Sequence, residues 1–113
     1  MENVFLTAAN SINARVDTIN TLSTLVYIDA EQHGLYDIYE GMTRAQQRRK
    51  LALRIMEEAA ELFAAADDED HYQEELADCV IMPASVAGFL GYNLGEIVER
   101  KRLINIDRPH GHK

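Results

Sequence analysis

Five carboxylates form two short motifs near the middle of the chain. The first motif holds Glu57, Glu58 and Glu61, and the second, after a spacer of thirteen residues, holds Glu75 and Asp78. Residues three positions apart lie on one side of a helix, so each motif can direct two carboxylates toward the same point. A site with oxygen donors only suits Mg²⁺ or Mn²⁺ rather than Zn²⁺. The two motifs together therefore predict a site for a hard divalent cation.

The position of each carboxylate on its helix separates candidate ligands from solvated side chains. Glu58 borders the apolar side of the first helix, Glu61 lies about 60° beyond Glu58, and Glu57 points away toward solvent. Glu75 lies in the middle of the apolar side of the second helix, with Asp78 about 60° from it. Carboxylates on a core-facing side are costly unless they are paired or coordinated. All of them except Glu57 are therefore expected to need a positively charged partner.

Arginines offer an alternative to a metal ion as that partner. Four of them precede the first motif: Arg44, Arg48, Arg49 and Arg54. Internal ion pairs with these side chains would neutralise the carboxylates without a cation. Arg48 and Arg54 lie too close to the helix surface to neutralise all four acids, which favours the metal.

A C-terminal pattern accompanies the acidic motifs. Lys101 is followed by Asn105 four positions later, by Arg108 three positions after that, and then by Pro109. The motifs in this order resemble those of the MazG-like all-α nucleoside triphosphate pyrophosphohydrolases, a superfamily that also contains the dimeric dUTPases and the dCTP pyrophosphatases. The family signature is Glu-Glu-x-x-Glu, a spacer and then Glu-x-x-Asp. The resemblance covers about residues 45–109, and residues 1–40 match no motif of the family.

The resemblance implies an activity and a division of roles. Members of the family convert a nucleoside triphosphate to the monophosphate and pyrophosphate with Mg²⁺, and they are dimers or dimers of dimers. By this resemblance the Mg²⁺ ligands, which could also hold Mn²⁺, would be Glu58, Glu61, Glu75 and Asp78. Glu57 would orient water or have no role. The triphosphate and sugar would be bound by Lys101, Asn105 and Arg108.

The composition favours helices that would position these residues. Only six glycines and two prolines occur in 113 residues, which argues against a many-stranded β fold. Helices are expected over about 7–32, 43–66, 70–90 and 93–103, with N-caps at Thr43, Asp70 and Asn93. Four helices with short connections predict a single all-α domain over residues 1–113, an antiparallel four-helix bundle of the all-α NTP pyrophosphatase type.

Charge and cysteine content exclude some classes of partner. The formal net charge of −8 argues against a general nucleic-acid or membrane-surface binder. No apolar run approaches the length of a membrane span. Cys79 is the only cysteine, which excludes an intrachain disulfide and favours a reducing, cytoplasmic location.

Three functions remain open from the sequence. The first is a Mg²⁺-dependent nucleoside triphosphate pyrophosphohydrolase that cleans the nucleotide pool and acts as a homodimer or homotetramer. The second is a non-catalytic acidic helical bundle that binds a partner protein. The third is a hydrolase of another nucleoside diphosphate-linked substrate, such as a nucleotide sugar. Candidates for stacking on a base are Tyr36, Tyr39, Phe63, Tyr72 and Tyr92.

Overall fold

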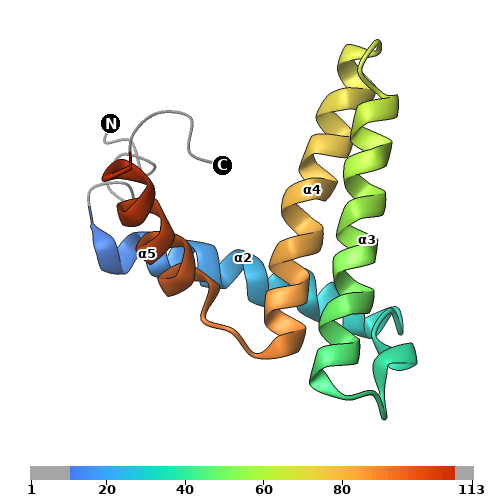
Figure 1. The fold of residues 1–113 in the computed structure, drawn as a ribbon, viewed down its shortest axis with the longest axis horizontal. Coiled ribbons are helices and arrows are strands. Elements are labelled where there is room, and N and C mark those ends of the chain that lie inside the picture. The colour runs from blue at the N-terminus through green and yellow to red at the C-terminus, as the bar shows by residue number, and fades with distance from the viewer. Residues whose placement is uncertain (1–10, 109–113) are drawn as a thin grey trace.

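The computed structural model describes residues 11–108, and this part of the chain is helical throughout, with no strand. Four α-helices and one short 3₁₀ turn follow one another along the chain (Figure 1): α2 (Ile12–Gln32), η1 (Asp37–Tyr39), α3 (Arg44–Ala64), α4 (Glu69–Leu90) and α5 (Leu94–Ile106). The predicted all-α class with four helices is therefore confirmed.

Helix α4 is the centre of the arrangement. It packs against α3 in an antiparallel hairpin and against α2, which crosses the base of that hairpin (Figure 1). After α4 the chain turns through 120°, and α5 runs back beside the first half of α2. Helix α5 therefore lies away from the upper part of the α3–α4 hairpin.

Side-chain caps define where the helices begin. The Thr43 hydroxyl accepts a hydrogen bond from the Gln46 backbone at 3.1 Å, and the Gln46 side chain accepts one from the Thr43 backbone at 2.9 Å. Asn93 Oδ1 accepts a hydrogen bond from the Glu96 backbone at 3.1 Å. The predicted caps of α3 and α5 are therefore confirmed.

The predicted cap of α4 at Asp70 is wrong. Asp68 Oδ1 accepts the hydrogen bond from the His71 backbone at 3.1 Å, and the helix begins at Glu69. Several consecutive acidic residues can each serve as a cap, and here α3 ends two residues earlier than predicted, which brings the cap forward. The predicted start of α2 near residue 7 lies outside the described residues.

The C-terminal helix is longer than predicted. It ends at Ile106 rather than near Leu103, so Asn105 lies in its last turn and Arg108 lies two residues beyond its end. The backbone N–H of Arg108 donates to the Asn105 carbonyl at 3.3 Å. The two residues therefore share one turn of backbone.

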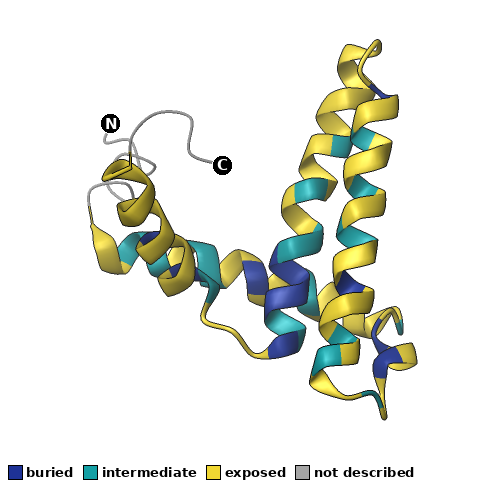
Figure 2. Cartoon of the chain, in the orientation of Figure 1, coloured by how far each residue is buried: buried dark blue, intermediate teal, exposed yellow. Residues whose placement is uncertain are grey.

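Buried side chains concentrate where α2, η1, α3 and α4 meet at the base of the hairpin (Figure 2). Tyr36 stacks on Phe89 with ring centroids 4.4 Å apart, and its hydroxyl lies 2.6 Å from the Ser85 hydroxyl. Tyr39 and Leu51 are each 1% exposed. Tyr36 and Tyr39 are thus core residues and are unavailable for stacking on a base, whereas Phe63, Tyr72 and Tyr92 are exposed.

The start of α5 lies against the backbone of α2. A Cβ atom at Gly95 would lie 2.3 Å from the Val16 carbonyl oxygen, so only glycine allows this approach. Asn20 Oδ1 accepts a hydrogen bond from the Gly95 backbone at 2.8 Å, and Asn20 Nδ2 donates to Asn93 Oδ1 at 2.8 Å. This polar contact fixes the position of α5 on α2.

A buried carboxylate provides a second tie between α5 and α2. Glu99 is 7% exposed and accepts hydrogen bonds from the guanidinium groups of Arg15 and Arg102, the latter at 2.9 Å. Arg15 first, and then Arg102, lowers the pKa of Glu99 from 4.5 to about 2. The ionised form of Glu99 is therefore bound to its partners in the folded protein.

We expect this ion pair to make the fold sensitive to acid. Because the pKa of Glu99 is lower in the folded than in the unfolded chain, its contribution is complete above about pH 4.5 and is lost as pH falls toward 2. Glu99→Gln should remove this part of the pH dependence of the free energy of unfolding, measured by urea titration between pH 5 and 2.5. Arg102→Gln should reduce it less, since Arg15 remains. An unchanged pH dependence in Glu99→Gln would contradict the assignment.

Candidate metal centre

Three predicted ligands converge between the two helices of the hairpin. Glu58 comes from α3, and Glu75 and Asp78 come from α4. One carboxylate oxygen from each lies within 4.8 Å of the others. Antiparallel packing places these turns opposite one another, and the three-residue spacing of Glu75 and Asp78 puts both on one side of α4. The group offers oxygen donors only, which suits a hard cation.

The other two acids of the first motif lie outside this group of three. Glu61 is exposed one turn after Glu58, and its negative charge acts on the Glu58 carboxyl. Glu57 is exposed on α3, as its position on the helix predicted. The structure thus brings together three of the four predicted ligands and places the fourth next to them.

The carboxylates of the group repel one another. Burial raises the pKa of Glu58, and the charges of Glu61, Asp78 and Glu75 raise it further. Like charges this close resist simultaneous ionisation unless a cation neutralises them. A positive charge placed between these carboxylates would therefore relieve their mutual repulsion.

Glu75 has one oxygen held and one oxygen free of protein partners. Its Oε1 lies 3.1 Å from His71 Nε2, while its Oε2 is buried and has no hydrogen-bond partner within residues 11–108. A buried unpaired carboxylate oxygen is costly, and coordination of a cation would satisfy it. His71 was not among the predicted site residues, although its four-residue spacing from Glu75 on one helix was a usable signal.

Internal ion pairs with arginine do not neutralise these carboxylates in the described part of the chain. The ion pairs found there join Arg15 and Arg102 to Glu99, and His71 to Glu75. Arg44, one of the arginines considered as a partner, donates instead to the Leu90 carbonyl. The acids of the hairpin therefore have no arginine partner within residues 11–108.

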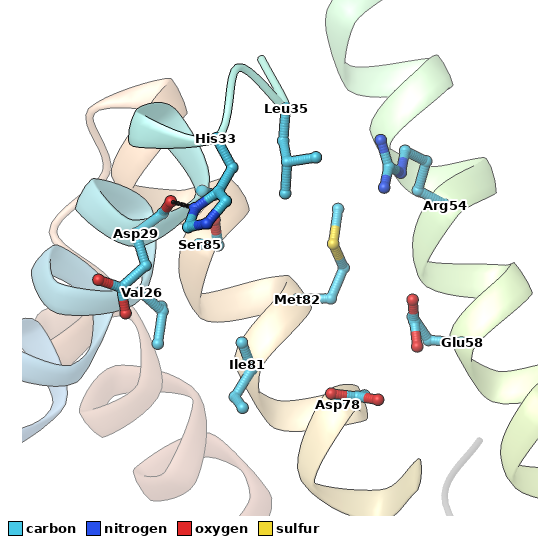
Figure 3. Close-up of a pocket in the computed structure, with 11 residues that line it drawn as sticks. Val26, Asp29, His33, Leu35, Arg54, Glu58, Asp78, Ile81, Met82 and Ser85 are labelled. Carbon is cyan, nitrogen blue, oxygen red and sulfur yellow. Dashed lines mark hydrogen bonds between the residues drawn. The ribbon is translucent and has the colours of Figure 1, made fainter.

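A cavity of about 350 Å³ adjoins the carboxylate group (Figure 3). Glu58 and Asp78 form part of its lining, and much of the remaining wall is apolar, with Val26 from α2, Leu35 from the following loop and Met82 from α4. The cavity exists because α2 crosses the base of the hairpin and closes one side of it. A ligand coordinated at the carboxylates could therefore extend into an apolar compartment.

Arg54 lines the cavity, and the sequence patterns did not predict a functional role for it. It lies one turn before Glu58 on α3, is half-buried, and lines the cavity between Leu35 and the carboxylates (Figure 3). From the sequence, Arg54 was expected only as a possible ion-pair partner for the acids. The position of Arg54 in a cavity depends on the crossing of α2, which forms the opposite wall.

The C-terminal motif lies elsewhere in the same chain. Lys101, Asn105 and Arg108 are exposed, and none of them lines the cavity beside the carboxylates. Lys101 and Asn105 border a separate hollow of about 430 Å³ on the surface of α5. Within one chain, therefore, the structure does not bring this motif to the acidic group.

No single helix within residues 11–108 is long and apolar enough to cross a membrane, although α4 and α5 taken together reach the required length and hydropathy as a pair bent by 120°.

Comparison of the chain with protein-family models, with curated proteins and with solved structures finds no match.

Proposed function

We propose that this protein is a Mg²⁺-dependent nucleoside triphosphate pyrophosphohydrolase, which produces a nucleoside monophosphate and pyrophosphate. The observation that carries the proposal is the convergence of Glu58, Glu75 and Asp78 at the edge of the apolar cavity. Such an arrangement can hold a cation, and with it a phosphate chain, next to a compartment suited to a nucleoside.

The residues present fit Mg²⁺ or Mn²⁺. Glu58, Glu75 and Asp78 would hold the ion, and Glu61 would supply a further oxygen from the next turn of α3. The buried, unpaired Oε2 of Glu75 supports this assignment. When bound, Mg²⁺ neutralises phosphate charge and makes the phosphorus more electrophilic.

The protein's own residues position the ligands and the substrate. The His71 imidazole orients Glu75 through its contact with Oε1. Glu57, exposed and outside the convergent group, would orient water or have no role. Without a cation, a chain of net charge −8 would repel a triphosphate, so the carboxylates bind substrate only in their metal-loaded form. In this proposal the enzyme acts on the nucleotide pool, and its location is therefore the cytoplasm.

The decisive test measures pyrophosphate release from a panel of ribo- and deoxyribonucleoside triphosphates with Mg²⁺. We expect turnover that stops with excess EDTA and returns with added Mg²⁺ or Mn²⁺, because carboxylates cannot approach a polyphosphate without a cation between them. Orthophosphate and a diphosphate as products would indicate attack at the terminal phosphorus. Turnover of a nucleotide sugar alone would indicate the related hydrolase, and an inactive protein would favour the interaction module.

We also propose a homodimer or homotetramer in which the C-terminal motif of one chain serves the carboxylates of another. Two observations support it. The motif lies away from the carboxylate group of its own chain, and large apolar side chains are exposed on the hairpin and on α2. The most exposed of these include Leu25, Leu53, Met56, Val80 and Phe63. A second copy would cover such surface and complete the site.

Mixing two inactive variants tests this arrangement. Glu75→Gln lacks a ligand and Arg108→Ala lacks a phosphate contact, so each alone should be impaired. If the motif acts between chains, co-expression should restore about a quarter of the wild-type activity, since half the dimers would carry one intact site of two. Activity no greater than the sum of the separate variants, or a sedimentation mass of 12.8 kDa at micromolar concentration, would contradict it.

A further inference from the structure

Arg54 places a positive charge in a cavity that has mostly apolar walls. Its side chain projects from α3 toward Leu35 and Met82 (Figure 3). It also lies near the buried Tyr36 hydroxyl, which pairs with Ser85. Arg54 thus contributes a positive charge to the cavity wall, whereas Arg48, Arg49 and Lys50 of the same helix are exposed and do not line the cavity.

No protein group within residues 11–108 is found to hydrogen-bond or form an ion pair with Arg54. Glu58 is one turn away on the same helix, and no ion pair joins its carboxylate to Arg54 within residues 11–108. A half-buried guanidinium without hydrogen-bond partners is costly, because water no longer surrounds it fully. Its five donors are therefore available to a ligand.

The position of the carboxylates decides which part of a nucleotide reaches Arg54. In the proposed function, the phosphate chain lies at Glu58 and Asp78, at one end of the cavity. The part of the molecule that extends past Met82 toward Leu35 meets a wall with a large apolar share, to which Asp29, His33 and Ser85 add polar groups (Figure 3). The apolar share of this wall suits the flat face of a base. Arg54 lies one helical turn before Glu58 on α3, and its side chain projects toward this part of the cavity (Figure 3).

We propose that Arg54 reads the nucleobase of the substrate and selects bases that present two adjacent hydrogen-bond acceptors on one edge. This inference rests on the proposed function of the site. A guanidinium only donates, and its fork matches O6 and N7 of guanine or O2 and N3 of cytosine. Adenine presents an amino donor beside each comparable acceptor, and uracil and thymine separate their two carbonyls by an N–H. Guanine and cytosine nucleotides are therefore the favoured substrates.

The test compares kcat/KM for GTP, CTP, UTP and ATP in the presence of Mg²⁺. A bidentate contact of this kind discriminates by about 1–3 kcal/mol, so the better of GTP and CTP should exceed ATP by roughly 5- to 150-fold. Arg54→Met should lower that ratio to near one by raising KM for the favoured nucleotide more than for ATP. Arg49→Met, which changes an exposed arginine of the same helix outside the cavity, should keep the wild-type ratio.

A binding measurement keeps the inference separate from the catalytic proposal. Calorimetry with GMP, CMP and AMP should show the same base order in the wild type, and no order in Arg54→Met, whether or not the protein hydrolyses triphosphates. Hydrolysis that shows no base preference would overturn the role of Arg54 and leave the proposed pyrophosphohydrolase activity standing. A loss of kcat/KM in Arg54→Met that is equal for every base would do the same. Absence of pyrophosphate release together with base-ordered binding would overturn the proposed reaction and leave Arg54.

Discussion

Replacing Glu75 with glutamine should lower pyrophosphohydrolase turnover by on the order of a thousand-fold while the helical circular-dichroism signal survives. The change keeps the size of the side chain and removes the charge of a carboxylate whose Oε2 has no protein partner within residues 11–108. Asp78→Asn should act in the same way. Turnover is measured as pyrophosphate release under saturating Mg²⁺.

The same variant, Glu75→Gln, should be more stable than the wild type in the absence of metal. The charges of Glu61, Asp78 and Glu75 raise the pKa of Glu58 together with its burial, so removing one charge relieves repulsion. Glu75→Gln should therefore unfold at a higher temperature than the wild type in EDTA, and Mg²⁺ should no longer raise its melting temperature. Thermal unfolding with and without Mg²⁺ measures both effects.

Glu57→Gln is the matched control, because Glu57 is exposed and lies outside the convergent group. It should retain most of the turnover and the Mg²⁺-dependent rise in melting temperature. Equal loss of activity from Glu57→Gln and Glu75→Gln would show that the two sides of α3 have been assigned wrongly.

Gly95→Ala should destabilise the fold by about 1–3 kcal/mol or more, since overpacking at a site that cannot yield is costly. The added Cβ would lie 2.3 Å from the Val16 carbonyl oxygen and 2.8 Å from the Val16 Cα, which are backbone atoms of α2. Moving α5 away to relieve this contact would also strain the hydrogen bond from the Gly95 backbone to Asn20. Urea unfolding followed by circular dichroism measures the loss.

Gly41→Ala is the control that distinguishes the cost of a steric clash from the cost of an unfavourable backbone conformation. Gly41 has φ of +83° and no atom within 4 Å of the added Cβ, so this change carries only the cost of a left-handed residue, about 1 kcal/mol. A Gly95→Ala loss no larger than that of Gly41→Ala would mean that α5 does not approach α2 as closely as described.

The sequence predicted the features that depend on local spacing. Thr43 and Gln46 cap α3 as expected, because a capping box needs only residues three positions apart. Glu58, Glu75 and Asp78 converge for a similar reason, since an antiparallel hairpin follows from two helices joined by a short turn. The cap at Asp68 was missed because neighbouring acids offer equivalent local signals.

Features that depend on long-range packing could not be read from these patterns. The cavity around Arg54 needs α2 to cross the hairpin, and no periodicity in α3 reports that crossing. The place of Lys101 and Arg108 depends on the turn after α4 and on the contact of Gly95 with Val16. Their separation from the carboxylates in one chain was therefore outside the reach of the motif spacing.

The uneven distribution of buried side chains along the hairpin sets the order in which its hydrogen bonds open. At the base, Ser85 and Leu90 lie among buried neighbours, whereas most residues near the turn around Asp68 face solvent (Figure 2). Backbone amides near the turn therefore exchange with solvent through local fraying, and those at the base exchange only when α2 also detaches. A ligand that joins Glu58 to Asp78 would protect amides further up the hairpin, toward the turn, from exchange by local fraying. Amide exchange would therefore report ligand binding at the carboxylate group without any turnover.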